Sequence, residues 1–362
     1  MPINLPEHSK AKWAAAQAAK DPSTKMRLLR EFYSSFPKHK GTERLQVALK
    51  RQIKRLEEEL ERARSHRTGS ARLAWGVKKE GLLQLAVVGT LATACHFFVQ
   101  ATGLPVEVHE ALERPVVGVV EGAGVQLQLV LTPFDMGIGE EKQDRFLALM
   151  RAADGLLIVV GFEPDQYVTD LTMWFERHSI DVLSDRPRVE LVLTPAGGLR
   201  ITGTAPHIDE RVLRAYLAGY NVRNAVVRLG YDATLDDVES VIFGREHKPG
   251  VFVALPGRTL EAWPKVWPRP VSLADGFERL ALHVLQRLGL IRVYTKGFGQ
   301  APVVRPLVVP RGERVIDVAA RIHKDLAAFF SQAQIWRGGG KAIRVGRNFG
   351  LQDGDVVEIR VS

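Results

Sequence analysis

The chain has 362 residues, of which 46% are hydrophobic and 25% charged, so it is long enough to bury a sizeable core and to form two or three domains. Its longest apolar runs, such as LLIVV at 156–160, are far shorter than the roughly 20 residues of a membrane-spanning helix, and the N-terminus has no apolar signal-peptide segment. We therefore expect a soluble, cytoplasmic protein with no membrane partner. The single cysteine, Cys95, excludes an intrachain disulfide and a cysteine-based zinc cluster.

Positive charge is concentrated at the two ends of the chain. Residues 1–80 contain 19 Lys and Arg against 9 Asp and Glu, residues 81–289 contain 19 against 26, and residues 290–362 contain 12 against 6. A polyanion is attracted by local positive charge, so this pattern predicts that the ends contact an anionic partner. The alternative is a solvated basic helix with a chance excess of charge.

Residues 1–75 are predicted to form a basic helical N-terminal region. Thr42 can cap a helix there, because apolar side chains follow it every three or four residues. Those side chains are Leu45, Leu49, Ile53, Leu56 and Leu60. The apolar stripe is narrow, so the segment is predicted to form a helical hairpin or a coiled-coil arm, and residues 65–76 a linker.

From residue 76 to residue 289, short apolar segments alternate with amphipathic ones. The predicted strands are 82–88, 125–131, 155–160, 189–193, 225–229 and 250–255. The predicted helices are 140–153, 165–179, 209–220, 234–244 and 275–289, with a further helix after Gly89. This alternation indicates an α/β fold with a doubly wound, mostly parallel sheet, whose ligand site is expected at the carboxyl ends of the strands.

The pattern changes again in residues 290–362, where IRVYTK and RPLVVP are followed by the helical VIDVAARIHKDLAAFF and then by AQIWRG and DGDVVEIRVS. These segments predict a small mixed sheet packed on a single helix. RGGGKA at 337–342 is predicted to be a hairpin turn rather than a phosphate site, because Ala342 follows the lysine and no helical pattern begins there.

Several of these segments resemble one family. IRVYTKGFG, PLVVPRGERVIDVAARIHKDL, AQIWRGGGKAIRVG and LQDGDVVEIRV resemble a TGS domain, the small β-grasp-like module of threonyl-tRNA synthetases, stringent-response enzymes and DRG-type GTPases. LAGYNVRNAVVRLGYDATLDDVESVIFG, KPGVFVALPG and the N-terminal FPKHKGTERLQVALKRQIKRLEEE resemble stretches of DRG-like GTPases. The resemblance to the DRG-like, Obg-related TRAFAC GTPases implies a P-loop-NTPase-like domain over 76–289 and a TGS domain over 290–362.

The phosphate loop of that family is altered where its chemistry resides. A working loop has the pattern GxxxxGK[ST], in which backbone amides and the lysine hold the phosphates and the hydroxyl ligates magnesium. Gly89 stands at the first glycine, and Ala94, Cys95 and His96 stand at the Gly-Lys-Ser positions. Cysteine carries no positive charge, and histidine is a poor ligand for the hard magnesium ion. Cys95 and His96 point about 100° apart on a helix, so a thiol nucleophile is not expected either.

The other nucleotide motifs are altered in parallel. The resemblance places Leu131 at the position of the magnesium-linked aspartate, keeps Thr132, and puts Phe134 where a glycine is common. The three positions that read guanine are occupied by Leu255, Pro256 and Arg258. We therefore expect a pseudo-GTPase with no catalytic residue, metal or cofactor, in which these positions form a vestigial site. An unconventional GTP-binding protein is an alternative.

The basic ends carry the predicted RNA contacts. In the N-terminal region these are Lys38, His39, Lys40, Lys50, Arg51, Lys54 and Arg55. In the C-terminal domain, cations are combined with flat rings in Arg292, Tyr294, Lys296, His323, Lys324 and Trp336, although Tyr294 and Trp336 have core packing as an alternative. We expect a nucleotide-independent factor that binds the ribosome, rRNA or tRNA, and no DNA. The alternative is a regulatory pseudo-GTPase that pairs with an active GTPase relative or another protein.

Overall fold

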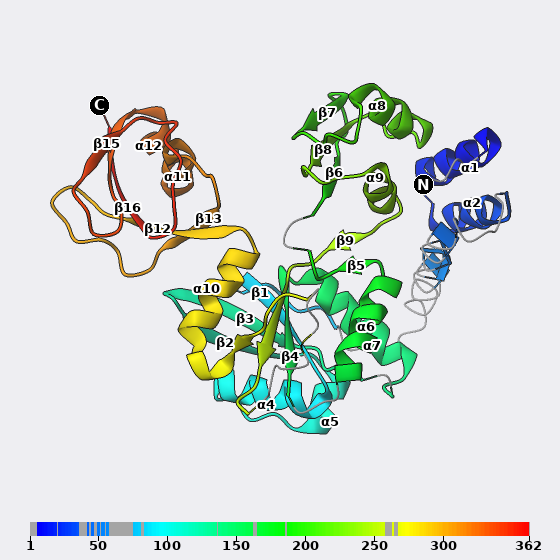
Figure 1. Ribbon diagram of the computed structural model, residues 1–362, viewed down its shortest axis with the longest axis horizontal. Helices are drawn as coiled ribbons and strands as arrows, with labels where there is room; N and C mark the ends of the chain where they lie inside the picture. Colours follow the sequence, from blue (N-terminus) through cyan, green and yellow to red (C-terminus); the bar gives the residue numbers. More distant parts are fainter. Residues whose placement is uncertain are drawn as a thin grey trace. The chain divides into compact units, whose positions relative to one another are not determined.

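The computed structural model describes residues 6–19, 21–35, 42, 45–46, 49–50, 52–54, 56–57, 75–80, 83–135, 137–161, 165–184, 187–257, 263 and 267–361. The chain divides into two compact units, one of residues 1–73 with 167–248 and one of residues 74–166 with 249–362 (Figure 1). The breaks at 167 and 248 fall inside the predicted 76–289 domain, and the limits of the three predicted domains stay predictions. Across these described ranges, no helix is long and apolar enough to span a bilayer.

A six-stranded sheet forms the centre of the second unit, in the order β11-β10-β4-β1-β3-β2. Its parallel strands are β1 (Leu83–Val88), β3 (Val125–Leu131), β4 (Gly155–Val160), β10 (Gly250–Ala254) and β11 (Val271–Ser272). Strands β1, β4 and β10 are buried at every residue, as expected for a parallel sheet covered on both faces. The predicted α/β class with a parallel sheet is therefore confirmed.

Two strands of this sheet were not predicted from the sequence, the two-residue β11 and an antiparallel edge strand. Strand β2 (Val116–Gly122) pairs antiparallel with β3 at the edge of the sheet, through a tight turn at Ala123 and Gly124. Both turn residues have positive φ, which explains the glycine. The helices of this part of the unit are α4 (Leu91–Thr102), α5 (Val108–Glu113), α6 (Glu140–Ala152), the short η3 (Leu273–Asp275) and α10 (Phe277–Arg287).

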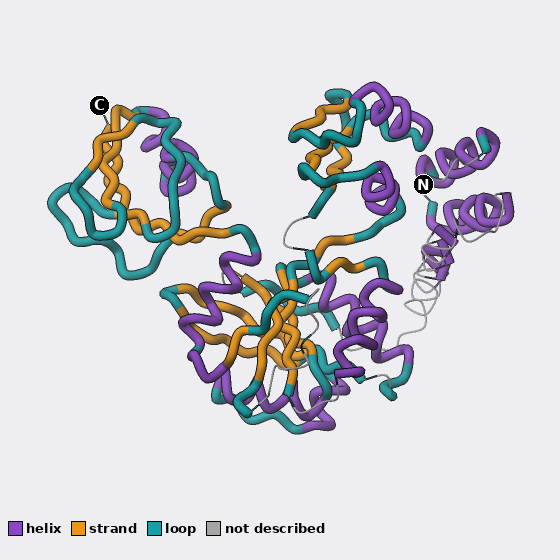
Figure 2. The backbone as a smooth tube through the Cα atoms, viewed as in Figure 1, coloured by secondary structure: helices purple, strands orange, loops and turns teal. Residues whose placement is uncertain are grey.

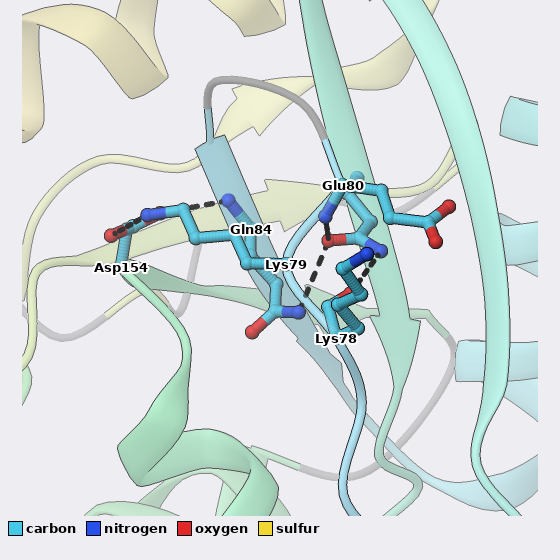
Figure 3. A network of polar contacts seen from close by, with 6 residues as sticks. Lys78, Lys79, Glu80, Gln84 and Asp154 are labelled. Carbon is cyan, nitrogen blue, oxygen red and sulfur yellow. Dashed lines mark hydrogen bonds and ion pairs between the residues drawn. The ribbon is translucent and has the colours of Figure 1, made fainter.

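Two buried glutamines attach residues 75–80 to the sheet. The side chain of Gln128 accepts a hydrogen bond from the Glu80 amide and donates one to the carbonyl oxygen of Lys78. Gln84 donates to Gln128 from its side chain and to Asp154 from its backbone amide, and Lys79 pairs with the same Asp154 carboxylate (Figure 3). Because buried amides need partners, this network fixes the chain where it enters β1.

A C-terminal module of residues 290–361 completes the second unit. Its mixed five-stranded sheet has the order β13-β12-β16-β14-β15, and Figure 2 shows these strands curving around a helical segment. The elements are β12 (Leu290–Thr295), β13 (Leu307–Pro310), α11 (Val315–Ile322), α12 (Lys324–Ala328), β14 (Phe330–Trp336), β15 (Ile343–Val345) and β16 (Asp355–Val361). The antiparallel pairing of β14 with β15 confirms the predicted hairpin turn at 337–342.

The first unit contains a second sheet that corrects the sequence prediction. Segments 189–193 and 225–229 were expected in the doubly wound sheet, which is wrong. They are β6 (Val189–Leu193) and β8 (Ala225–Leu229) of a separate sheet, ordered β6-β8-β7 with β7 (Leu199–Thr202). The physical reason is one-sided burial, since Glu190 and Arg228 form a 2.8 Å ion pair across the two strands.

Helices α8 (Glu210–Gly219) and α9 (Leu235–Ile242) pack on that sheet. The two-residue strands β5 (Ile180–Asp181) and β9 (Glu246–His247), which precede and follow it in the sequence, form a separate parallel pair. The connecting helix α7 (Asp165–Arg177) precedes β5. The unit also contains the N-terminal helices α1 (Glu7–Ala18) and α2 (Pro22–Ser35).

The predicted apolar stripe of the N-terminal region lies in a core shared with residues 167–248, the segment inserted between β4 and β10. Leu45 and Leu49 are buried together with Trp13, Phe32 and Tyr220. The Trp13 ring lies 5.3 Å from Phe32, between ring centroids, and makes an edge contact with the ring of Phe243. The described part of the basic region is therefore anchored in the core of a folded unit, whereas the sequence predicted a helical hairpin or a coiled-coil arm.

Candidate functional site

The turn from β1 to α4 contains only two residues, Gly89 and Thr90. Thr90 caps the helix by accepting a hydrogen bond from the Thr93 amide at 3.3 Å, and the Ala94 amide donates to the Thr90 carbonyl oxygen at 2.8 Å. A Cβ atom at Gly89 would lie 2.9 Å from the carbonyl oxygen of Val159, so the close approach of β4 requires glycine there. Gly89 thus has a packing role that does not involve phosphate.

The three altered phosphate-loop positions lie within α4 rather than in a loop. Ala94 is fully buried and Cys95 is 7% exposed, and both belong to the core under the sheet, whereas His96 is exposed. Burial raises the pKa of the Cys95 thiol. Because α4 begins at Leu91, its first turn occupies the length of chain that would form a phosphate-binding loop.

The segment after β3 packs directly against this turn. The Thr132 amide and hydroxyl both donate to the carbonyl oxygen of Val87, at 2.9 and 3.0 Å. The Phe134 amide donates to the carbonyl oxygen of Gly89 at 2.7 Å, and the Phe134 side chain is only 1% exposed. The Thr132 hydroxyl is therefore used in the fold, and Phe134 fills space beside the β1–α4 turn.

The remaining described positions of the predicted vestigial site lie at the same edge of the sheet. Leu131 and Leu255 are buried in the core cluster that also contains Ala94 and Cys95, and the Leu255 amide bonds to the Val160 carbonyl oxygen at 3.0 Å. Pro256 follows at the surface, and Arg258 lies outside the described residues. The structure therefore brings Ala94, Cys95, Leu131 and Leu255 together in one apolar core, whereas His96 and Pro256 are exposed.

A P-loop fold implies a magnesium–nucleotide complex at this edge, and the residues can be tested against it. Phosphates need a cation and several inward-facing amides, and magnesium needs oxygen ligands. At the described motif positions the side chains are Ala94, Cys95, His96, Leu131 and Leu255, which supply neither a lysine nor a carboxylate. The amide of Ala94 is already bonded within the helix. These residues do not fit the complex.

Two of the predicted N-terminal RNA contacts can be placed. Lys50 and Lys54 are exposed one helical turn apart, on the side away from the buried Leu49, and the Lys50 ammonium lies 5.9 Å from the centroid of the Tyr33 ring. The other predicted contacts in this region, Lys38, His39, Lys40, Arg51 and Arg55, lie outside the described residues.

In the C-terminal module, four predicted contacts share one face of the sheet. Val293, Ile335 and Val357 belong to the core beneath α11, and side chains alternate along a strand, so their neighbours lie on the opposite, outer face. This outer face carries Arg292, Tyr294, Lys296 and Trp336. Tyr294 and Trp336 are half-buried there, which differs from the core packing that was the alternative.

Two of these cations are already engaged inside the protein. Arg292 forms a two-pronged pair with Asp353, at 2.9 Å for Nη2, and donates from Nη1 to the carbonyl oxygen of Ala123 at 3.3 Å. Burial of Asp353 opposes the effect, but the hydrogen bonds from Arg292 hold the pKa of this carboxyl below its usual range. Lys296 lies 3.9 Å from the centroid of the Trp336 ring and 3.6 Å from Glu358.

The other two predicted contacts lie at the junction of α11 and α12. His323 is exposed and accepts a hydrogen bond from the Asp325 amide at 3.2 Å, which caps α12. Lys324 is exposed beside it. The outer face also carries Arg344 on β15 and Arg360 on β16, which the sequence reasoning did not single out. Their alternation with the buried Val345 and the half-buried Ile359 is the signal that places them there.

Comparison with known proteins finds one domain family and several relatives, among them the three that follow. Residues 291–361 match the TGS domain. A GTP-binding protein of Methanocaldococcus jannaschii is 29% identical over 272 residues, covering 67% of this chain and 68% of the relative. Developmentally-regulated G-protein 3 of Arabidopsis thaliana is 28% identical, covering 67% and 71%. Ribosome-interacting GTPase 1 of Saccharomyces cerevisiae is 26% identical, covering 92% and 98%.

Proposed function

Because this chain belongs to the DRG-like branch of the Obg-related GTP-binding proteins, with a C-terminal TGS domain, we propose that it is a pseudo-GTPase that binds the ribosome or its RNA without nucleotide. It acts in translation, in the cytoplasm. It performs no GTP hydrolysis. The degenerate domain serves as a scaffold, and the two basic ends make the contacts.

Nucleotide independence is supported above all by the position of α4. The helix starts at Leu91, so Ala94 and Cys95 lie in the core and their amides belong to a helix instead of a cradle. Electrostatic contacts with a triphosphate stabilise such complexes by several kcal/mol each, and the aligned positions supply none of them. The fold does not depend on these contacts, since apolar packing replaces them.

Ribosome association is supported by charge and by one relative. The relative that covers 92% of this chain is named as ribosome-interacting. Positive charge is concentrated at both ends of the present chain, and Lys50 and Lys54 are exposed on a helix whose other side is anchored in a core. Lysines exposed on such a helix can neutralise RNA phosphates.

Calorimetry with GTP and magnesium tests nucleotide independence. The full chain should give no binding heat at micromolar affinity, whereas an active relative such as the yeast protein serves as the positive control. A saturable signal from this chain would contradict the pseudo-GTPase proposal.

Sedimentation with ribosomes tests the contacts. The tagged protein should pellet with ribosomes at low salt and be released at high salt, because phosphate contacts displace counterions. Reversing Lys50 and Lys54 to Glu should weaken pelleting, whereas reversing the exposed Arg211 and Arg223 of the same unit should not. Equal pelleting of the two double variants would exclude the N-terminal contact.

Nuclease treatment separates RNA from protein partners. Loss of the captured material after RNase favours the ribosome or RNA. A protein partner that survives RNase, such as an active GTPase relative, would favour the regulatory pseudo-GTPase instead.

A further inference from the structure

Phe298, in the loop after β12, is among the most exposed large apolar side chains of the C-terminal module, with 79% of its surface accessible. An exposed phenyl ring contributes little to folding, because burial of apolar surface is what stabilises the core. Single exposed apolar side chains are common, so exposure by itself identifies no site. What distinguishes Phe298 is the set of contacts that holds its ring.

The ring of Phe298 contacts Arg360 on one side, and Arg360 in turn is bound to Glu358. The guanidinium carbon of Arg360 lies 5.0 Å from the ring centroid. Arg360 is itself fixed by Glu358, which accepts from Nε and Nη2 at 3.1 Å each and is only 3% exposed. A buried carboxylate therefore orients the arginine, and the arginine orients the ring.

The same carboxylate organises a second pair of cation and ring. The Lys296 ammonium lies 3.6 Å from Glu358 and 3.9 Å from the centroid of the Trp336 ring. Glu358 thus stands between two cations, each of which covers an aromatic ring. Two cations and one carboxylate leave this part of the outer face positive.

Positive charge continues across the sheet. Arg344 of β15 is opposite Gln334 of β14, and Gln334 is opposite Glu358 of β16, so these side chains form one row across the outer face. Arg344 is exposed. The module as a whole has 12 Lys and Arg against 6 Asp and Glu, which suits an anionic occupant rather than an apolar one.

We propose that the outer face of the C-terminal sheet is a stacking platform for unpaired nucleotides of RNA. The free side of the Phe298 ring receives a base, Arg360 supports that ring from the other side, and the exposed Arg344 neutralises the backbone phosphates. Aromatic stacking requires a base released from a duplex, so the platform distinguishes single-stranded RNA from paired RNA. This inference rests on the proposed RNA binding and names the form of RNA that the C-terminal module takes.

The test uses the full chain and two labelled RNA probes. One is an unstructured oligonucleotide of about 10–12 nucleotides, within the site size of small single-strand binding domains, and the other is a blunt duplex of the same length. Phe298→Leu keeps an apolar side chain but removes the ring, and Phe298→Tyr keeps the ring. Phe329→Leu is the matched control, because Phe329 is also exposed, at 60%, but caps α12 away from this row.

Loss of one stacked base should weaken single-strand binding about 5- to 100-fold in Phe298→Leu, with Phe298→Tyr and Phe329→Leu close to the wild type. Arg360→Lys should give an intermediate loss, since it keeps the charge but not the planar fork to Glu358. The affinity for the duplex should be the same in Phe298→Leu as in the wild type. Melting temperatures measured alongside verify that each variant is folded.

Two results would overturn the platform without touching the proposed function. One is unchanged single-strand affinity in Phe298→Leu while ribosome pelleting persists. The other is that Phe298→Leu keeps its affinity for the single strand but no longer captures a protein that survives nuclease treatment in wild-type pull-downs. That result would assign the ring to a protein contact. If the wild type binds neither ribosomes nor either probe, the proposed function itself fails.

Discussion

The two sheets of the second unit differ in the side chains that they carry at the predicted binding positions. At the carboxyl edge of the parallel sheet, three of the predicted nucleotide-motif positions, Ala94, Leu131 and Leu255, are apolar and buried. On the outer face of the C-terminal sheet, cations remain at the surface and are oriented by a buried carboxylate, Glu358. A fold can keep its shape when apolar packing takes the place of a ligand site, whereas the C-terminal sheet keeps charged side chains in fixed orientations at its surface.

The largest effect is expected from putting the phosphate-loop lysine back. Cys95→Lys should destabilise the protein by about 3–5 kcal/mol, because it places an unpaired charge in the core. The neighbouring His96→Lys is the control and should change stability by less than about 0.5 kcal/mol, since His96 is exposed. Urea unfolding measures both. A Cys95→Lys protein that is as stable as His96→Lys and binds GTP would erase the contrast between the two sheets.

A smaller loss is expected at Arg292, which belongs to the outer face but is engaged within the protein. Arg292→Ala should lower the free energy of unfolding by about 1–3 kcal/mol, because it leaves Asp353 and the Ala123 carbonyl oxygen without their charged donor. Lys324→Ala, at an exposed position, should have no measurable effect on unfolding. If both variants unfold like the wild type, Arg292 is available for RNA and its internal bonds contribute little.

The same ion pair predicts a dependence on pH. The folded-state pKa of Asp353 is lowered, so the stabilisation is complete above the ordinary pKa of aspartate and is lost as the pH falls through the folded value. Asp353 is 44% exposed, so the advantage of the wild type over Asp353→Asn should be about 1 kcal/mol or less at neutral pH. That advantage should shrink between about pH 5 and pH 2. If the stability advantage of the wild type grew on acidification, the folded-state pKa of Asp353 would be raised and not lowered.

The smallest effect concerns the reactivity of Cys95. Its pKa is raised by burial, so at mildly alkaline pH the native thiol should react with iodoacetamide much more slowly than the thiol in urea. Rapid modification of the native protein would mean that the edge of the parallel sheet opens readily. Mass spectrometry after timed quenching measures the rate.

The sequence predicted the elements of the parallel sheet well because β1, β4 and β10 are short continuous apolar runs. The sequence prediction placed β6 and β8 in the wrong sheet, because strands and helices alternate in residues 167–248 as they do around the parallel sheet. The polar residues Glu190 and Arg228 within those strands were the available sign of one-sided burial.

Motif positions predicted the altered site but not its local geometry. Ala94, Cys95 and His96 were recognised from their alignment with a motif, whereas the early start of α4 depends on the Thr90 cap and on the Phe134 contact to Gly89. In the same way, Trp336 and Lys296 were singled out from the sequence, whereas Arg360 and Phe298, which belong to the proposed platform, were not. Their relation runs through Glu358, and a contact between strands distant in sequence has no local signature.

The break in the parallel sheet has a consequence for synthesis. Strand β4 ends at Val160, and its partner β10 begins only at Gly250, after the whole insert. A nascent chain released up to Lys248 therefore contains every residue of the first unit but leaves one edge of β4 without its partner. Until β10 leaves the exit tunnel, that hydrophobic edge of β4 has to be shielded from other strands, so the parallel sheet can be completed only after the residues between β4 and β10 have been synthesised.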